Sequence, residues 1–188
     1  MVESPCFAAG SAKDLHLTVR VYDYAQLPAE ERHELAANAQ RILRQAGVEV
    51  EFVECYRAGV ETGLPACSGC LHPAEFMLRI FTAKSTANGK QPAFAAMTPE
   101  GGAIMTLYIN PMECGGGGGA LGYGTRLGHA VAHEIGHLLL GPNSHSSGGI
   151  MRSVWRKTED ESMAKRSLLF DSGQASRLRA TLIARSSR

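Results

Sequence analysis

The chain has 188 residues, of which 44% are hydrophobic and 20% charged, and its formal net charge is +1. This length predicts a single domain with a core of its own. The near-neutral charge gives no indication of a nucleic-acid partner or of a charged membrane surface, and no apolar run is long enough to predict membrane insertion.

Regular patterns in the first quarter of the chain predict a βαβ unit. Residues 1–13 show no periodicity and are expected to be irregular. Apolar and polar residues alternate over 15–22, apolar residues recur at helical spacing over 28–46, and alternation returns over 48–52. A strand, a helix and a strand of these lengths predict two parallel strands joined by a right-handed crossover.

Two more strands are predicted in the middle of the chain. Residues 76–81 are almost continuously apolar and bounded by turn signals, which indicates a central strand, and residues 103–109 form a further strand. The segment 84–102 between them is polar and interrupted by glycine and proline, so no regular element is expected there. Residues 55–74, with three cysteines and three glycines, predict a loop.

The chain contains five cysteines, an odd number that permits at most two internal disulfides. They are Cys6, Cys55, Cys67, Cys70 and Cys114. No second CxxC pair is present to complete a structural zinc site with Cys67 and Cys70. A disulfide-stapled loop near Cys55 and residues 67–70 is the favoured interpretation, and free thiols are the alternative.

A helix predicted from about Thr125 to Leu140 carries His133, Glu134 and His137 in the spacing HExxH. Residues four apart lie on the same face of a helix, so the two imidazoles can bind one metal ion. Zinc lowers the pKa of a bound water to about 7, and a carboxylate beside the first ligand is placed to take a proton from the attacking water. The alternative is an amphipathic core helix that carries two histidines by chance.

The residues after this helix add a third candidate ligand. Gly141 and Pro142 predict the end of the helix, because glycine accepts the left-handed conformation and proline prevents continuation. His145 then follows in a loop and supplies the third protein ligand that a catalytic zinc site needs, with a fourth position left open. His129 lies about 12 Å from His137 along the helix axis, so it is expected to lie behind the ligands or to face solvent.

The end of the chain is predicted to form one more helix. Asp171 or Ser172 is expected to cap it, and Gln174 stands three residues after Asp171 in a capping-box arrangement. The charged stretch 157–161 carries no predicted element.

The stretch from His133 to Met151 resembles the metzincin clan of zinc metallopeptidases, whose pattern is HExxHxxGxxH followed by a tight turn with a methionine beneath the zinc, the Met-turn. The resemblance implies His133, His137 and His145 as ligands of one catalytic Zn²⁺, Glu134 as general base and Met151 as the Met-turn residue. It implies no other cofactor.

The spacing departs from the clan pattern at two places. Three residues instead of two separate His137 from Gly141, and three instead of two separate Gly141 from His145. One extra helical residue rotates the exit of the chain by about 100°. The extra loop residue must bring His145 back if it is to reach the metal.

The resemblance also implies a fold and an activity. The expected fold class is α/β (α+β), metzincin-like, with a twisted mixed β-sheet and the active-site helix below it. Residues 1–188 would form one catalytic domain, with an upper subdomain over about 14–141 and a smaller, mostly irregular lower subdomain over about 142–188 that ends in a helix. Residues 103–109 would be the edge strand, to which extended peptide substrates add as a further strand.

The expected function is therefore a zinc-dependent endopeptidase acting on a peptide or protein substrate. One alternative is a gluzincin-type peptidase, in which Glu159 or Glu161 is the third ligand. Another is a non-catalytic, zinc-containing binding module on a peptidase fold. Metzincins are mostly exported and the cysteines point the same way, so a secreted or periplasmic location is expected, although no signal peptide is recognisable. The sequence does not predict the oligomeric state.

Overall fold

The computed structural model describes residues 15–57, 59–83, 93–97, 103–110 and 121–187. The predicted irregular segment 1–13, Cys6 and Cys114 lie outside the described residues. Six described strands form one sheet in the order β3-β2-β1-β4-β6-β5. Their bounds are β1 Leu15–Asp23, β2 Val48–Arg57, β3 Val60–Glu61, β4 Glu75–Thr82, β5 Ala93–Met97 and β6 Ala103–Ile109.

The predicted βαβ unit is confirmed. Strand β1 pairs in parallel with β2, with Leu15 opposite Val48, and α1 (Ala29–Gln45) connects them. Strand β1 also pairs in parallel with β4, and β4 in parallel with β6. The centre of the sheet is therefore parallel, and the two edge strands β3 and β5 run antiparallel to their neighbours. The sheet is mixed, as the fold-class prediction required.

The prediction that residues 103–109 form the edge strand is wrong. Strand β6 lies inside the sheet, between β4 and β5, and the edge on this side is β5. Strand β5 comes from the segment 84–102, where no element was predicted. Its sequence, Ala-Phe-Ala-Ala-Met, has no β-branched residue and no alternation of polar and apolar residues, so it gives only a weak strand signal.

Two smaller expectations also differ from the structure. Strand β2 continues to Arg57 and pairs with β3, so the first part of the predicted loop 55–74 belongs to the sheet. The charged stretch 157–161 lies in a helix, α3 (Lys157–Ala164). Only Glu159 and Met163 of that helix are buried. Its sequence therefore lacks the recurring apolar residues by which an amphipathic helix is predicted.

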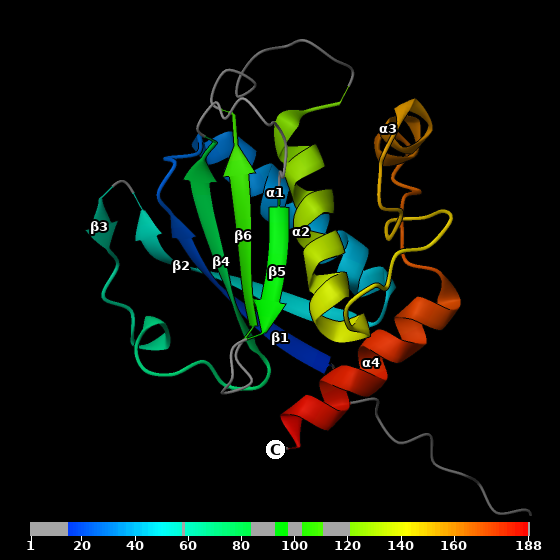
Figure 1. The fold of residues 1–188 in the computed structure, drawn as a ribbon. Helices are drawn as coiled ribbons and strands as arrows, with labels where there is room; N and C mark the ends of the chain where they lie inside the picture. The colour runs from blue at the N-terminus through cyan, green and yellow to red at the C-terminus, as the bar shows by residue number, and fades with distance from the viewer. Residues whose placement is uncertain (1–14, 58, 84–92, 98–102, 111–120, 188) are drawn as a thin grey trace, which may run out of the picture.

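Helices cover one face of the sheet (Figure 1). Helix α1 packs on β2, and α2 (Tyr123–Leu140) packs on α1, β5 and β6. The last helix, α4 (Ser172–Ser186), contacts α2 and β1. It starts as predicted, with a capping box in which Asp171 and Gln174 bond each other's backbone N–H groups. Among the helices that the structure describes, none combines the length and apolar character needed to cross a bilayer.

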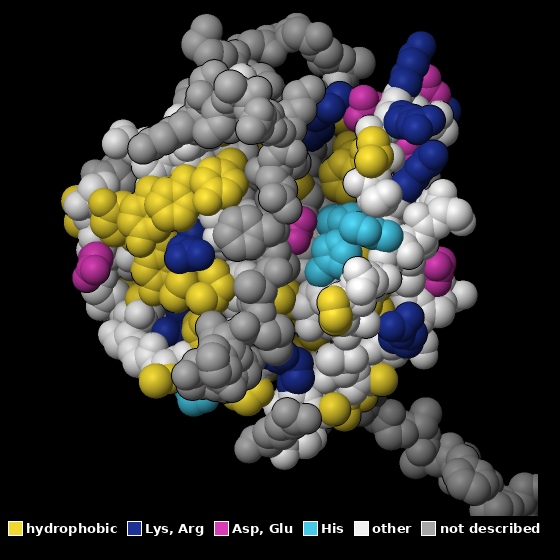
Figure 2. All heavy atoms as spheres, viewed as in Figure 1, with side chains coloured by type: hydrophobic (Ala, Val, Ile, Leu, Met, Phe, Trp, Pro, Cys, Tyr) yellow, Lys and Arg dark blue, Asp and Glu magenta, His cyan; other side chains and the backbone are white. Residues whose placement is uncertain are grey.

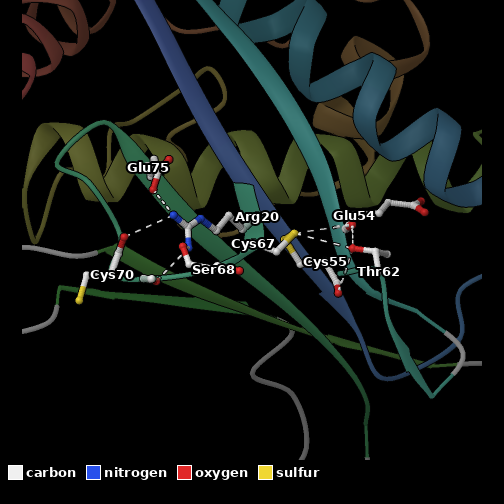
Figure 3. The surroundings of a disulfide bond; sticks show 9 residues. Arg20, Glu54, Cys55, Thr62, Cys67, Ser68, Cys70 and Glu75 are labelled. Atoms are coloured by element: carbon white, nitrogen blue, oxygen red, sulfur yellow. Dashed lines mark hydrogen bonds and ion pairs between the residues drawn. A yellow bond between two sulfur atoms is a disulfide. The ribbon is translucent and has the colours of Figure 1, made fainter. Parts of the chain in front are cut away.

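The other face of the sheet is partly covered by the segment after β3, which a disulfide fastens to β2 (Figure 3). Cys55 of β2 is bonded to Cys67, so the stapled-loop interpretation is confirmed, and Cys70 is an exposed free thiol. Arg20 of β1 binds the same segment through hydrogen bonds. Its guanidinium donates to the carbonyls of Ser68, Gly69 and Cys70 and pairs with Glu75 at 2.5 Å.

Candidate metal centre

Helix α2 carries two histidines and a glutamate in its C-terminal half. It begins two residues before the predicted start, and the backbone N–H of Gly124 donates to the Glu31 carboxylate of α1. This bond satisfies one of the free donors at the helix start. The helix ends at Gly141, as predicted, with φ at 93° and its N–H bonded to the carbonyl of His137. Only glycine adopts this backbone conformation without strain.

Two histidines of α2 and one from the loop after it converge at one point. The Nε2 atom of His137 lies 3.0 Å from Nε2 of His133 and 3.1 Å from Nε2 of His145. All three ligand atoms lie within 4.8 Å of one another. Ligand nitrogens about 2.0–2.1 Å from a tetrahedral zinc ion are separated by roughly 3.3 Å. The extra loop residue thus offsets the extra helical residue, and the three imidazoles fit one metal ion.

The outer nitrogens of two of these rings are hydrogen-bonded. Nδ1 of His133 donates to the carbonyl oxygen of Ile150 at 2.7 Å, and Nδ1 of His137 is bonded to Ser144 Oγ at 3.0 Å. A neutral imidazole that carries its proton on Nδ1 presents a free lone pair on Nε2. These bonds turn the lone pairs toward the common point between the rings, which is the arrangement found around metal-binding histidines.

Burial keeps the inner histidines neutral. It lowers the pKa of His137 to about 4, with a further contribution from His133 and His145 nearby. Burial also lowers the pKa of His133, although the bond to the Ile150 carbonyl works against the shift. Metal binding competes with protons for imidazole nitrogens. At neutral pH, therefore, these two rings need not release a proton before they bind a cation.

Glu134 follows His133 on the same helix and is 8% exposed. Burial raises the pKa of its carboxyl to about 7, because a low-dielectric surrounding penalises the charged form. A carboxyl that titrates near neutral pH can both accept and return a proton under physiological conditions.

Met151 is fully buried beneath the helix turn that joins the two helical histidines. A Cβ placed on Gly136 would lie 2.5 Å from Met151 Sδ, so the sulfur packs directly on the helix backbone. The loop that delivers Met151 is tied together by its own backbone: Ser146 N–H donates to the Met151 carbonyl, and Ile150 N–H donates to the carbonyl of Leu169. This folding directs the Ile150 carbonyl at His133.

The remaining sequence candidates lie elsewhere. His129 is fully buried and its Nδ1 donates to the Thr125 carbonyl at 2.8 Å, so of its two expected placements the solvent-facing one is wrong. Glu159 accepts the Arg156 N–H and pairs with Arg152 at 2.7 Å. These contacts occupy its carboxylate and disfavour it as a third ligand. Glu161 is exposed on α3.

Sequence reasoning missed three groups at the site: the Ser144 hydroxyl, the Ile150 carbonyl and the Trp155 indole. Trp155 donates from Nε1 to the Ile150 carbonyl at 3.2 Å, and its ring stands perpendicular to that of His133. A backbone acceptor has no residue signature. The serine next to His145 was visible in the sequence but offers no signal on its own.

The histidine site is open to solvent on the face shown in Figure 2. Histidine side chains gather there into one group, with an acidic side chain beside it. His145 is exposed, whereas His133 and His137 are partly buried. A molecule in solution can therefore approach the point at which the three rings meet.

Comparisons with known proteins bear on the fold. The sequence matches no known family and no curated protein. The structure is similar to the crystal structure of archaemetzincin from Methanopyrus kandleri, with a TM-score of 0.53 at 14% sequence identity. The similarity covers 91% of this chain and 98% of the archaemetzincin chain. It shows that the fold is metzincin-like.

Proposed function

We propose that this protein is a zinc-dependent endopeptidase in which His133, His137 and His145 hold one zinc ion and Glu134 is the general base. The observation that carries the proposal is the convergence of three imidazole Nε2 atoms, together with the buried Glu134 that directly follows His133 on α2. Three nitrogen ligands with an open approach are typical of catalytic zinc sites, whereas structural sites are closed by four ligands. Met151 would support this site from beneath.

When bound there, zinc supplies Lewis-acid chemistry, since it acidifies water and polarises a carbonyl oxygen. Glu134 takes the proton of the attacking water on its carboxylate and then passes it to the nitrogen of the leaving amine. Its pKa near 7 suits both steps, because a group of this strength gains and loses a proton with little cost at neutral pH. His133 and His137 stay neutral and act only as ligands.

The substrate is proposed to be an extended peptide lying along β5. This strand is the edge of the sheet and packs on α2, the helix that carries His133 and His137 (Figure 1). An edge strand offers unpaired backbone N–H and C=O groups, to which an extended chain can pair as one more strand. The role first assigned to residues 103–109 therefore passes to β5.

The test compares native protein with Glu134→Gln, both loaded with one equivalent of zinc. We expect both to retain zinc, measured by elemental analysis after gel filtration. Cleavage of a mixed peptide library, followed by mass spectrometry, should fall at least about 100-fold in the variant, which is the usual contribution of a general base. Glu161→Gln, at an exposed carboxylate of α3, is the matched control and should cleave like the native protein.

Two results would count against the proposal. Undiminished cleavage by Glu134→Gln would remove Glu134 from the mechanism. Zinc binding without cleavage by the native protein would favour the binding-module alternative.

A further inference from the structure

Trp155 stands next to the candidate metal centre without being one of its ligands. It is the only tryptophan of the chain. Its ring centroid lies 5.5 Å from that of His133, and the two ring planes are perpendicular at 90°. Edge-to-face packing at this separation is a favourable geometry for aromatic rings and restricts their rotation. Trp155 therefore limits the orientations that the His133 imidazole can adopt.

Trp155 and His133 also share one hydrogen-bond acceptor. The Ile150 carbonyl accepts from Nδ1 of His133 at 2.7 Å and from Nε1 of Trp155 at 3.2 Å. A carbonyl oxygen has two lone pairs, so both bonds can form together. The N–H of the same residue donates to Leu169 at 3.0 Å, and the Ile150 side chain is fully buried. The position of the Ile150 carbonyl is thus fixed by the hydrogen bonds and the burial of its own residue.

The neighbours of Trp155 have no comparable contacts with the site. Ser153 and Val154 are exposed, Val154 by 61%, and α3 begins two residues after Trp155. Among residues 152–156, which lead from Met151 to α3, the Trp155 indole contacts the His133 ring. Its ring is partly buried, so it combines a fixed apolar contact with a directed N–H bond.

We propose that Trp155 is a positioning residue of the metal centre, which holds the His133 imidazole with Nδ1 on the Ile150 carbonyl and Nε2 turned toward His137 and His145. The inference rests on the proposed function only in that the three histidines bind zinc. It does not require peptide cleavage. Groups that orient a metal ligand in this way typically change metal affinity by about 10–100-fold when they are removed.

The experiment measures zinc affinity by competition with a chromogenic chelator. Trp155→Phe keeps an aromatic ring and removes the N–H, and we expect it to weaken zinc binding by about 10-fold. Val154→Ala, at the exposed neighbour, is the matched control and should bind zinc like the native protein. Circular dichroism of the metal-free proteins checks that each variant is folded.

Coupling to His133 separates positioning from a merely structural role. In a His145→Ala background, Trp155→Phe should still weaken metal binding, because His133 remains to be oriented. In a His133→Ala background, the same substitution should have no further effect. A cobalt titration gives a second readout: Co²⁺ should quench the Trp155 emission of the native protein, and the cobalt absorption bands should differ in Trp155→Phe.

The outcomes distinguish this inference from the proposed function. Equal zinc affinity of Trp155→Phe and native protein, or an equal loss in the His133→Ala background, would overturn the positioning role. Zinc binding that depends on Trp155, without cleavage of any peptide, would support the inference and contradict the endopeptidase. A native protein that binds no zinc would overturn both.

Discussion

Burial shifts the pKa values of Glu134 and His137 in opposite directions. It raises the pKa of Glu134 to about 7 and is the main cause that lowers the pKa of His137 to about 4. Both shifts favour the uncharged form, because a low-dielectric surrounding penalises charge of either sign. In the metal-free protein, both side chains are therefore largely neutral between these two values.

We expect Glu134→Gln to gain stability relative to the native, metal-free protein as the pH rises from 4.5 to 7. The native carboxyl binds its proton more tightly in the folded state, so the stability it contributes at low pH is lost as the pH rises through its folded pKa. Glutamine does not titrate. The difference in unfolding free energy should change by about 1–3 kcal/mol across this range. Urea unfolding of chelator-treated protein at several pH values measures it.

His137→Gln is a control for which the pH dependence of stability should change in the opposite direction. Its folded pKa is depressed from 6.5 to about 4, so the stability that it contributes above pH 6.5 is lost as the pH falls toward 4. His137→Gln should remove this acid-side loss. If the unfolding free energy of both variants depends on pH as that of the native protein does, the pKa shifts of Glu134 and His137 are contradicted.

At the residue scale, the sequence located the three histidines that lie together in the structure but not the groups that support them. The spacing of His133, Glu134 and His137 follows from helix geometry alone and needs no tertiary information. Whether His145 reaches the other two histidines depends on one extra residue before Gly141 and one after it. Their effects compensate each other in the folded loop, which the sequence alone does not show. The Ile150 carbonyl and Trp155 were missed because their roles arise from where the backbone of that loop turns.

At the scale of elements, α2, which carries two of the histidines, makes a close contact with α1. A Cβ on Gly128 of α2 would lie 2.6 Å from the carbonyl oxygen of Leu35 and 2.7 Å from Cβ of Asn38. Both atoms belong to α1, and the nearer one is backbone, so neither can move aside without moving that helix. The absence of a side chain at Gly128 therefore sets how near α2 lies to α1.

We expect Gly128→Ala to destabilise the protein by about 1–2 kcal/mol, measured by urea unfolding. Alanine favours a helix over glycine by about 1 kcal/mol. Overpacking against a rigid neighbour costs about 1–3 kcal/mol or more, and here it exceeds the helix preference. Gly173→Ala is the matched control, since Gly173 is an exposed helical residue whose added Cβ would meet only Asp171 Oδ1 at 3.3 Å. Its stability should stay equal or rise, and the same result for Gly128→Ala would refute the close-contact argument.

Helices and strands with a regular spacing of apolar residues were predictable from the sequence, and those without such a spacing were not. Strand β1, α1 and α2 each bury a regular set of apolar residues, and their bounds were expected to within a few residues. Strand β5 is short and rich in alanine, and α3 is mostly charged. Both take their conformation from neighbouring elements, which a local pattern cannot show. The misplaced sheet edge follows directly from the missed β5.

At the scale of the whole molecule, the disulfide and the candidate metal centre lie in different parts of the described fold. The disulfide joins β2 to the segment after β3 on the open face of the sheet (Figure 3). Two histidines of the site lie on α2, a helix that packs on β5 and β6. Strands β1 and β4 separate β2 from β6 in the sheet. The division into an upper and a lower subdomain stays a prediction. The disulfide and the three histidines belong to different parts of the fold.

We therefore expect zinc binding and the disulfide to stabilise the protein independently. Zinc at about 1,000 times its dissociation constant should add about 4 kcal/mol to the unfolding free energy, because it binds the folded chain alone. The disulfide closes a separation of 12 residues, which in the chain-entropy description contributes about 3 kcal/mol. Effects at sites without shared contacts add to within about 0.5 kcal/mol.

Urea unfolding of native protein and of a Cys55→Ser, Cys67→Ser double variant, each with and without zinc, completes the cycle. The zinc-dependent gain should be the same in both proteins. A zinc gain that falls by more than about 1 kcal/mol when the disulfide is absent exceeds the error of such cycles. It would mean that the β2 side of the sheet transmits strain to the end of α2, and that the parallel centre of the sheet does not isolate the metal centre from the stapled loop.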